Sequence, residues 1–124
     1  MGHHPKGRLV TGTFGSEGPS DGSQVIQVLT LPAKAPVVLT AANLAFGTDV
    51  SIPGDPRCAG DSTAPNPASG VFCVYFYNRK GLSKPYLQPY DILGGTRSVF
   101  MYADPSVAVG SDVMWWGVFA YQAP

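Results

Sequence analysis

Histidines, acidic residues and serines are the side chains with which this chain could carry out catalysis. The only two histidines, His3 and His4, lie near the start of the sequence. No internal imidazole is therefore available as a general base or a metal ligand. Glu17 is the only glutamate, and a glycosidase would need two aspartates, for which Asp91 and Asp104 could serve. These patterns predict that the protein is not an enzyme and has no catalytic residue and no cofactor.

Three aspartates recur at six-residue intervals around a stretch rich in proline and glycine: Asp49, Asp55 and Asp61. Carboxylates at a regular spacing can coordinate calcium, but this spacing is not that of an EF-hand loop. Aspartate also accepts hydrogen bonds from the backbone of turns, which is its commoner use in loops. We therefore expect turn-capping aspartates here and no metal site.

The two cysteines, Cys58 and Cys73, are 15 positions apart. Neither belongs to a CxxC pair or has a histidine at a suitable spacing, which disfavours a zinc site. Two interpretations remain: a disulfide that closes the loop between them, or two separate buried thiols. We predict the disulfide, which would stabilise the fold by about 3 kcal/mol in the chain-entropy account.

Two tyrosines beside prolines could bind a ligand without catalysis. The segment 84–90 reads Lys-Pro-Tyr-Leu-Gln-Pro-Tyr and places Tyr86 and Tyr90 four residues apart. Rigid aromatic rings of this kind can stack against sugars or proline-rich peptides. The alternative is an edge strand whose tyrosines pack half-buried against a sheet. Tyr86 and Tyr90 are therefore the candidate ligand platform.

The composition limits both the fold and the partners. The chain of 124 residues carries eight basic and eight acidic side chains, a balance that disfavours nucleic acid, which needs clustered cations. Its 15 glycines and 12 prolines disfavour a helical bundle. No apolar stretch approaches the roughly 18 residues that span a bilayer, and residues 1–12 lack the features of a signal peptide. We expect one domain over residues 8–124, preceded by an arm over residues 1–7 that could tie the chain to a neighbour.

Strands and turns account for the rest of the sequence. β-Branched and aromatic runs, separated by Gly, Pro, Asn and Asp clusters, predict seven or eight short strands. The expected strand ranges are 8–14, 24–31, 37–46, 50–52, 71–77, 86–93, 98–103 and 113–121. Residues 15–23 are expected to form a turn and residues 53–70 a long loop. The pattern predicts an all-β fold, an antiparallel β-sandwich of the jelly-roll kind.

The expected strands at 71–77 and 113–121 are apolar on both faces, whereas a sandwich strand with one solvated face alternates with polar residues. Either a long loop covers the second face, or another subunit does. In the closing strand Trp116 shares a face with small side chains, and we expect it to fill the core. On the opposite face we expect the interface of a homo-oligomer, formed by Trp115, Phe119 and Tyr121.

Three segments of the chain resemble a known family. They are Val10-Thr-Gly-Thr-Phe14, Cys58 with Gly70-Val-Phe-Cys-Val-Tyr75, and the ending Trp116-Gly-Val-Phe-Ala-Tyr-Gln-Ala-Pro124. They are similar to the small C-terminal β domains of bacterial collagen-like and phage fibre-type proteins, although this chain has no Gly-X-Y stalk. The resemblance implies a jelly-roll-like, trimeric domain that acts as an assembly head or a surface-exposed tip.

These observations predict a non-enzymatic structural protein that works by self-association and surface attachment. The resemblance implies a virion component, such as a capsid decoration or fibre-associated protein, located on a virion or at an extracellular surface. A homotrimer attached to a further protein surface is the expected assembly, with neither nucleic acid nor a membrane span involved. The alternative is a carbohydrate- or peptide-binding surface module that uses Tyr86 and Tyr90.

Overall fold

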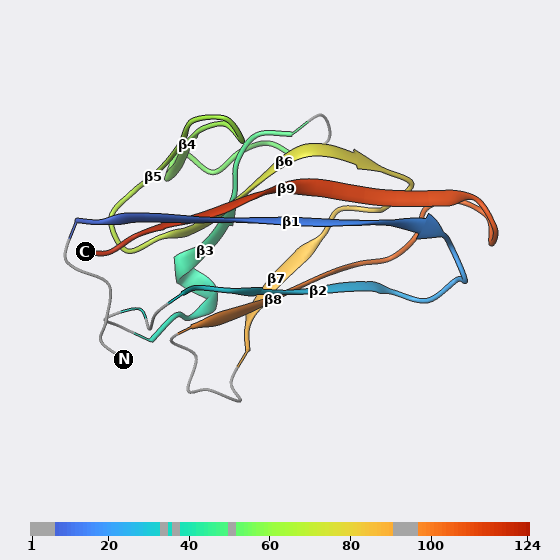
Figure 1. Ribbon diagram of the computed structural model, residues 1–124, viewed down its shortest axis with the longest axis horizontal. Coiled ribbons are helices and arrows are strands. Elements are labelled where there is room, and N and C mark those ends of the chain that lie inside the picture. Colours follow the sequence, from blue (N-terminus) through green and yellow to red (C-terminus); the bar gives the residue numbers. More distant parts are fainter. Residues whose placement is uncertain (1–6, 33–34, 36–37, 50–51, 91–96) are drawn as a thin grey trace.

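Two β-sheets packed face to face make up the molecule, which is described by a computed structural model (Figure 1). The structure describes residues 7–32, 35, 38–49, 52–90 and 97–124. The larger sheet has the strand order β1 (Leu9–Pro19), β9 (Asp112–Gln122), β6 (Phe72–Lys80) and β3 (Leu44–Phe46). The smaller sheet has the order β2 (Val25–Thr30), β8 (Ser98–Ala103) and β7 (Tyr86–Pro89). Paired strands are antiparallel except β3 and β6, and the prediction of an all-β sandwich is confirmed.

A small hairpin lies on the larger sheet, on the side that faces away from the smaller one (Figure 1). It consists of β4 (Cys58–Gly60) and β5 (Pro65–Pro67), which are paired antiparallel. The prediction of a long loop over 53–70 is corrected here, because the end of that segment nearest β6 is paired and anchored. Its anchors are the Cys58–Cys73 disulfide and the Tyr75 hydroxyl, which donates a hydrogen bond to the Ala59 carbonyl at 2.7 Å.

Other strand boundaries differ from the expectation. Of the strand expected at 37–46, only β3 forms, because residues 38–40 are not in a strand and a 3-10 turn occupies Ala41–Asn43; residue 37 lies outside the described residues. The turn forms because the Asn43 side chain accepts hydrogen bonds from the backbone N–H and the hydroxyl of Thr40. The first strand runs on to Pro19 instead of turning at residue 15, because β9 pairs with it along its whole length. Residues 1–6 of the expected arm, residues 50–51, and residues 91–93 of the expected strand 86–93 lie outside the described residues.

The core lies between the two sheets and takes alternate residues of each strand. On β9 the inward set includes Trp115, Phe119 and Tyr121, all of them buried within the chain. The prediction that these three residues form a subunit interface is therefore wrong. Trp116, which was expected in the core, points outward and is 46% exposed.

The space available on each face of β9 explains why Trp115, Phe119 and Tyr121 face the core while Trp116 faces outward. The small residues on the outer face of β9 make room for the hairpin rather than for a large ring, since Ala120 packs in one cluster with Cys58, Cys73 and Tyr75. On the inner face Gly12 occupies the place beside the Phe119 ring, where a side chain would collide with it. The rings of Trp115, Phe119 and Tyr121 therefore point between the sheets.

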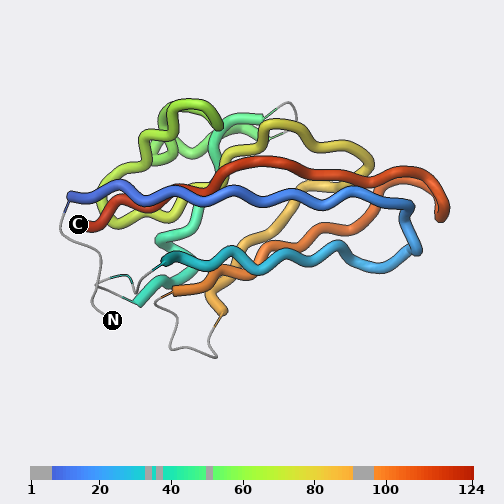
Figure 2. The backbone as a smooth tube through the Cα atoms, in the orientation of Figure 1, coloured from blue at the N-terminus to red at the C-terminus, as the bar shows by residue number. Residues whose placement is uncertain are grey.

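The two long edge strands, β1 of the larger sheet and β2 of the smaller sheet, run along the same side of the molecule (Figure 2). The C-terminus lies beside the beginning of β1 (Figure 2), where the Ala123 N–H donates a hydrogen bond to the Arg8 carbonyl at 3.1 Å. The opposite edges are formed by β3 and β7. Each sheet thus presents one outer face, directed away from the core.

Candidate functional site

The outer face of the smaller sheet carries six apolar side chains that are exposed or half-buried. We call this surface the tyrosine face; its residues are Ile26, Val28, Tyr86, Tyr90, Phe100 and Tyr102. Ile26 is 52% exposed and Tyr86 is 56% exposed. None of the six side chains is charged. Residues of the same strands at the alternate positions, such as Leu29 and Met101, are buried in the core.

Strand register brings these side chains into rows. Tyr102 of β8 pairs with Ile26 on one side and with Tyr86 on the other, and the three lie in one row across the sheet. The neighbouring row is formed by Val28, Phe100 and Gln88. Because directly opposed residues of a sheet point to the same face, both rows project away from the core.

The aromatic rings of the tyrosine face form a continuous series. Ring centroids of Tyr86 and Tyr102 are 5.5 Å apart with an interplanar angle of 25°, and those of Phe100 and Tyr102 are also 5.5 Å apart. Tyr90, just beyond the end of β7, follows with its centroid 6.1 Å from that of Phe100. Such contacts fix the rings relative to one another, because offset and tilted aromatic pairs attract. The result is a preorganised apolar surface.

One end of the tyrosine face is polar. The hydroxyls of Thr30 and Ser98 lie 3.1 Å apart and share a hydrogen bond across β2 and β8. The backbone N–H of Tyr90 donates to the Ser98 carbonyl at 3.1 Å, which places Tyr90 at the same end. An apolar centre with a polar edge is the arrangement typical of protein interfaces.

The sequence-based ligand platform, Tyr86 and Tyr90, lies on this face but is only part of it. Tyr86 lies on an edge strand, as the alternative interpretation expected. That interpretation also expected a half-buried ring, whereas the Tyr86 side chain is 56% exposed. Sequence reasoning missed the residues that β2 and β8 contribute to the face. A signal was present, because both of these strands have adjacent apolar residues that must point to opposite faces.

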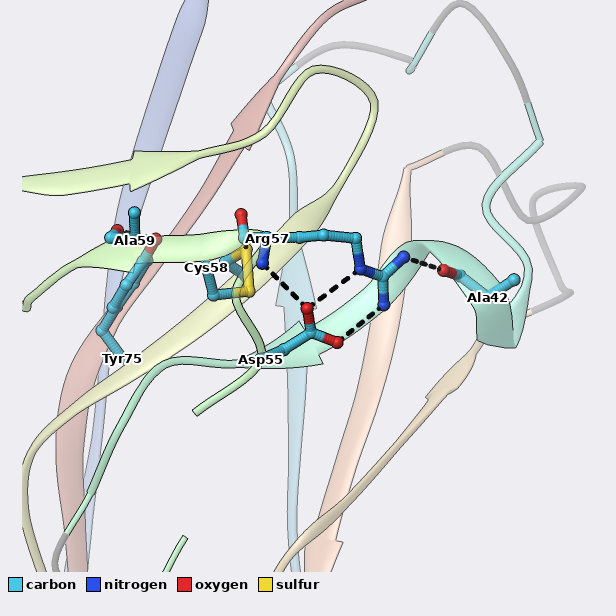
Figure 3. The surroundings of a disulfide bond; sticks show 7 residues. Ala42, Asp55, Arg57, Cys58, Ala59 and Tyr75 are labelled. Carbon is cyan, nitrogen blue, oxygen red and sulfur yellow. Dashed lines mark hydrogen bonds and ion pairs between the residues drawn. A yellow bond between two sulfur atoms is a disulfide. The ribbon is translucent and has the colours of Figure 1, made fainter. Parts of the chain in front are cut away.

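The disulfide is the second feature that the sequence predicted, and it is confirmed (Figure 3). Cys58 at the start of β4 and Cys73 on β6 are joined with their Cα atoms 5.6 Å apart. Beside the bond, the Arg57 guanidinium holds the Asp55 carboxylate at 2.9 Å and donates to the Ala42 carbonyl (Figure 3). The hydrogen bonds from Arg57 lower the pKa of Asp55, and burial raises the pKa of Tyr75. The disulfide fastens the hairpin to β6, and Arg57 ties the segment before the hairpin to the 3-10 turn.

Each of the three evenly spaced aspartates has a structural role. Asp61 caps the hairpin turn by accepting hydrogen bonds from the Thr63 hydroxyl at 2.7 Å and from two backbone N–H groups. Asp49 pairs with Arg79 at 2.8 Å, and both of these side chains are largely buried. The interpretation of Asp61 as a turn cap is confirmed. Within the part of the chain that the structure describes, no group of three or more His, Cys, Asp or Glu residues could hold a metal ion.

Comparison of the chain with protein-family models, curated proteins and solved structures found no match. The resemblance to collagen-like and fibre-type domains therefore stays a prediction. No helix among the described residues is long and apolar enough to cross a membrane.

Proposed function

We propose that the protein is a non-enzymatic assembly module that self-associates through the tyrosine face. The observation that carries the proposal is a series of four aromatic rings, of which Tyr86 is exposed and the other three are half-buried, beside the exposed Ile26 and Val28. Proteins in water rarely leave a contiguous apolar surface of this kind uncovered. Interface centres are also poor in charge and rich in Tyr and Phe, as this surface is.

Further copies of the same face are the occupants that suit it best. A sheet face without charge has no preference for a basic or acidic partner, and the apolar faces of further copies match it in chemistry. Closed cyclic assemblies reuse one surface on every subunit. We propose a homotrimer, as the family resemblance implies, in which three tyrosine faces converge on the symmetry axis.

The place of action that we propose is a virion or an extracellular surface, as a capsid decoration or a fibre-associated protein. The Cys58–Cys73 disulfide supports it, because structural disulfides persist mainly outside the reducing cytosol. In this arrangement the trimer attaches to a further protein surface. Neither nucleic acid nor a membrane span takes part.

Light scattering coupled to size-exclusion chromatography tests the assembly. The wild-type protein should have three times the mass of the 13.0 kDa chain. Ile26→Lys and Tyr86→Lys each place a charge on an exposed position of the face and should give folded monomers, because burying an unpaired charge is costly. Tyr77→Lys is the matched control, since Tyr77 is exposed on the other sheet. The proposal would be refuted if the wild-type protein were monomeric at a protein concentration of about 100 micromolar, or if both lysine variants remained trimeric.

A surface module that binds carbohydrate or peptide through Tyr86 and Tyr90 is the second candidate. The exposure of the Tyr86 ring favours it. Against it, Tyr86 stacks on Tyr102 and Tyr90 packs against Phe100, so both rings belong to a larger continuous surface. A wild-type monomer that binds a glycan or a proline-rich peptide, with the binding lost in Tyr86→Ala, would favour this candidate over self-association.

A further inference from the structure

A neutral groove lies on the outer face of the larger sheet beside the hairpin, and Gln27 of β2 in the smaller sheet also lines it. Its volume is about 610 Å³. Trp116, Tyr77 and Val118 give it apolar walls, and Thr13, Ser62 and Thr63 add hydroxyl groups. None of the ten described residues that line it is charged.

Trp116 is held in the groove by the strand beside it. It pairs with Gly15 of β1, and a Cβ atom on Gly15 would lie 3.3 Å from the indole ring. The glycine therefore gives the six-membered ring a place against β1, as aromatic side chains cover glycines of edge strands elsewhere. Almost half of the Trp116 side chain remains exposed, which leaves an immobilised ring open to a ligand.

Tyr77 reaches the same groove through a β-bulge. The register between β6 and β9 shifts between Phe76 and Asn78, so that Tyr77 has no partner of its own and Asn78 pairs with Trp116. Bulges redirect side chains in this way. Tyr77 is 76% exposed, a large exposure for an aromatic ring on a strand. Both exposed rings of this sheet thus line one groove.

The chemistry of the groove selects among ligand classes. Its lack of cations disfavours nucleic acids and other polyanions. Its hydroxyl groups can both donate and accept hydrogen bonds, as sugar hydroxyls also do, whereas a proline-rich peptide offers chiefly carbonyl acceptors. The C–H face of a pyranose ring is apolar and fits the electron-rich face of an indole or phenol ring.

We propose that this groove binds a neutral carbohydrate, with a pyranose ring stacked on Trp116 and a neighbouring unit beside Tyr77. The Thr63 hydroxyl donates its hydrogen to Asp61 at 2.7 Å, so that its oxygen can serve a sugar hydroxyl only as an acceptor. The hydroxyls of Thr13 and Ser62 supply donors. Gln27 points to the opposite side of β2 from its neighbours Ile26 and Val28, because it pairs with Met101 of the core. Assembly through the tyrosine face and sugar binding in the groove can therefore occur together.

An array of neutral oligosaccharides (glucans, mannans, galactans and N-acetylglucosamine oligomers), followed by fluorescence titration of the strongest binder, tests the site. Trp116→Ala and Tyr77→Ala should each weaken binding about tenfold or more, as loss of a central aromatic contact does. Tyr86→Ala, on the other sheet, should bind like the wild type. The bound sugar should also protect Trp116 from quenching by acrylamide.

The outcomes separate this inference from the proposed assembly. Ile26→Lys removes the trimer under the assembly proposal but should leave sugar binding unchanged. Tyr77→Ala is expected to fold normally because the side chain is so exposed, and it tests the groove even where Trp116→Ala loses stability. Three results would overturn the inference: no binding of any array sugar, binding that both groove variants retain, or binding of decaproline in preference to sugars.

Discussion

Replacing each of the two adjacent tryptophans of β9 by alanine should separate the core of the sandwich from its surface. Trp115 is fully buried, with its ring centroid 6.5 Å from that of Phe14 and 6.3 Å from that of Phe76. Trp116, the next residue, is 46% exposed on the opposite face. The pair tests the orientation of β9 with two variants of the same chemistry.

The expected losses follow from the buried area. A buried tryptophan removes about 150–250 Å² from water, which at about 25 cal/mol per Å² corresponds to roughly 4–6 kcal/mol. Measured truncations of core Phe and Trp cost about 3–5 kcal/mol, and we expect this range for Trp115→Ala. Trp116 buries roughly half of its surface and borders solvent, so that Trp116→Ala should cost about 1–2 kcal/mol.

Urea unfolding and thermal melting measure the difference. The melting temperature should fall by about 10–20 °C in Trp115→Ala and by only a few degrees in Trp116→Ala. Trp115→Phe is the control: the Trp115 Nε1 has no hydrogen-bond partner among the described residues, so that phenylalanine loses packing but no hydrogen bond. It should therefore cost much less than alanine. A loss in Trp116→Ala that equals or exceeds the loss in Trp115→Ala would refute the assigned orientation of β9.

Three further predictions concern the hairpin and β1. Reduction of the disulfide should cost about 3 kcal/mol and lower the melting temperature; two free thiols in the unreduced, denatured protein would contradict it. The Thr63 hydroxyl and backbone N–H donors lower the pKa of Asp61, so that the cap is intact at neutral pH and is lost as the pH falls through this lowered pKa. Thr63→Val should raise the pKa of Asp61 toward its usual value in an NMR titration, and an unchanged pKa would exclude the hydroxyl as its main cause. Gly12→Ala should destabilise the fold because its Cβ would collide with the Phe119 ring, whereas Gly18→Ala, with open space around it, should be neutral or stabilising by about 0.4–1 kcal/mol; equal effects in urea unfolding would contradict the packing.

Local patterns in the sequence were sufficient for several of the strands, and they favoured the disulfide. The run over 71–77 is β-branched and aromatic apart from Cys73, and β6 begins within it at Phe72. Cys58 and Cys73 are the only cysteines, so the sequence leaves two possibilities, a disulfide between them or two free thiols. The structure contains the disulfide. The orientation of β9 could not be obtained in the same way. Both of its faces are apolar, so that alternation groups the residues correctly but does not say which group faces the core.

The composition of the tyrosine face depends on contacts between distant segments. Tyr86 and Tyr90 stand out in the sequence because prolines flank them. Ile26 precedes its strand partner Tyr102 by a long stretch of chain, and only the register of β2, β8 and β7 makes them neighbours. Local patterns therefore reveal single aromatic residues, whereas the area of the surface that they form depends on strand pairing.

Glycines that indicate a turn in the sequence can lie within a strand of the folded protein. Gly15 begins a segment, 15–23, whose composition is typical of a turn, yet it lies within β1 opposite Trp116. Gly12 likewise lies within β1, opposite Phe119. In both places the missing side chain provides the space that an aromatic ring of β9 occupies. The glycines of β1 thus accommodate one ring in the core and one in the groove, and the same strand pairing determines the packing of the sandwich and the exposure of Trp116.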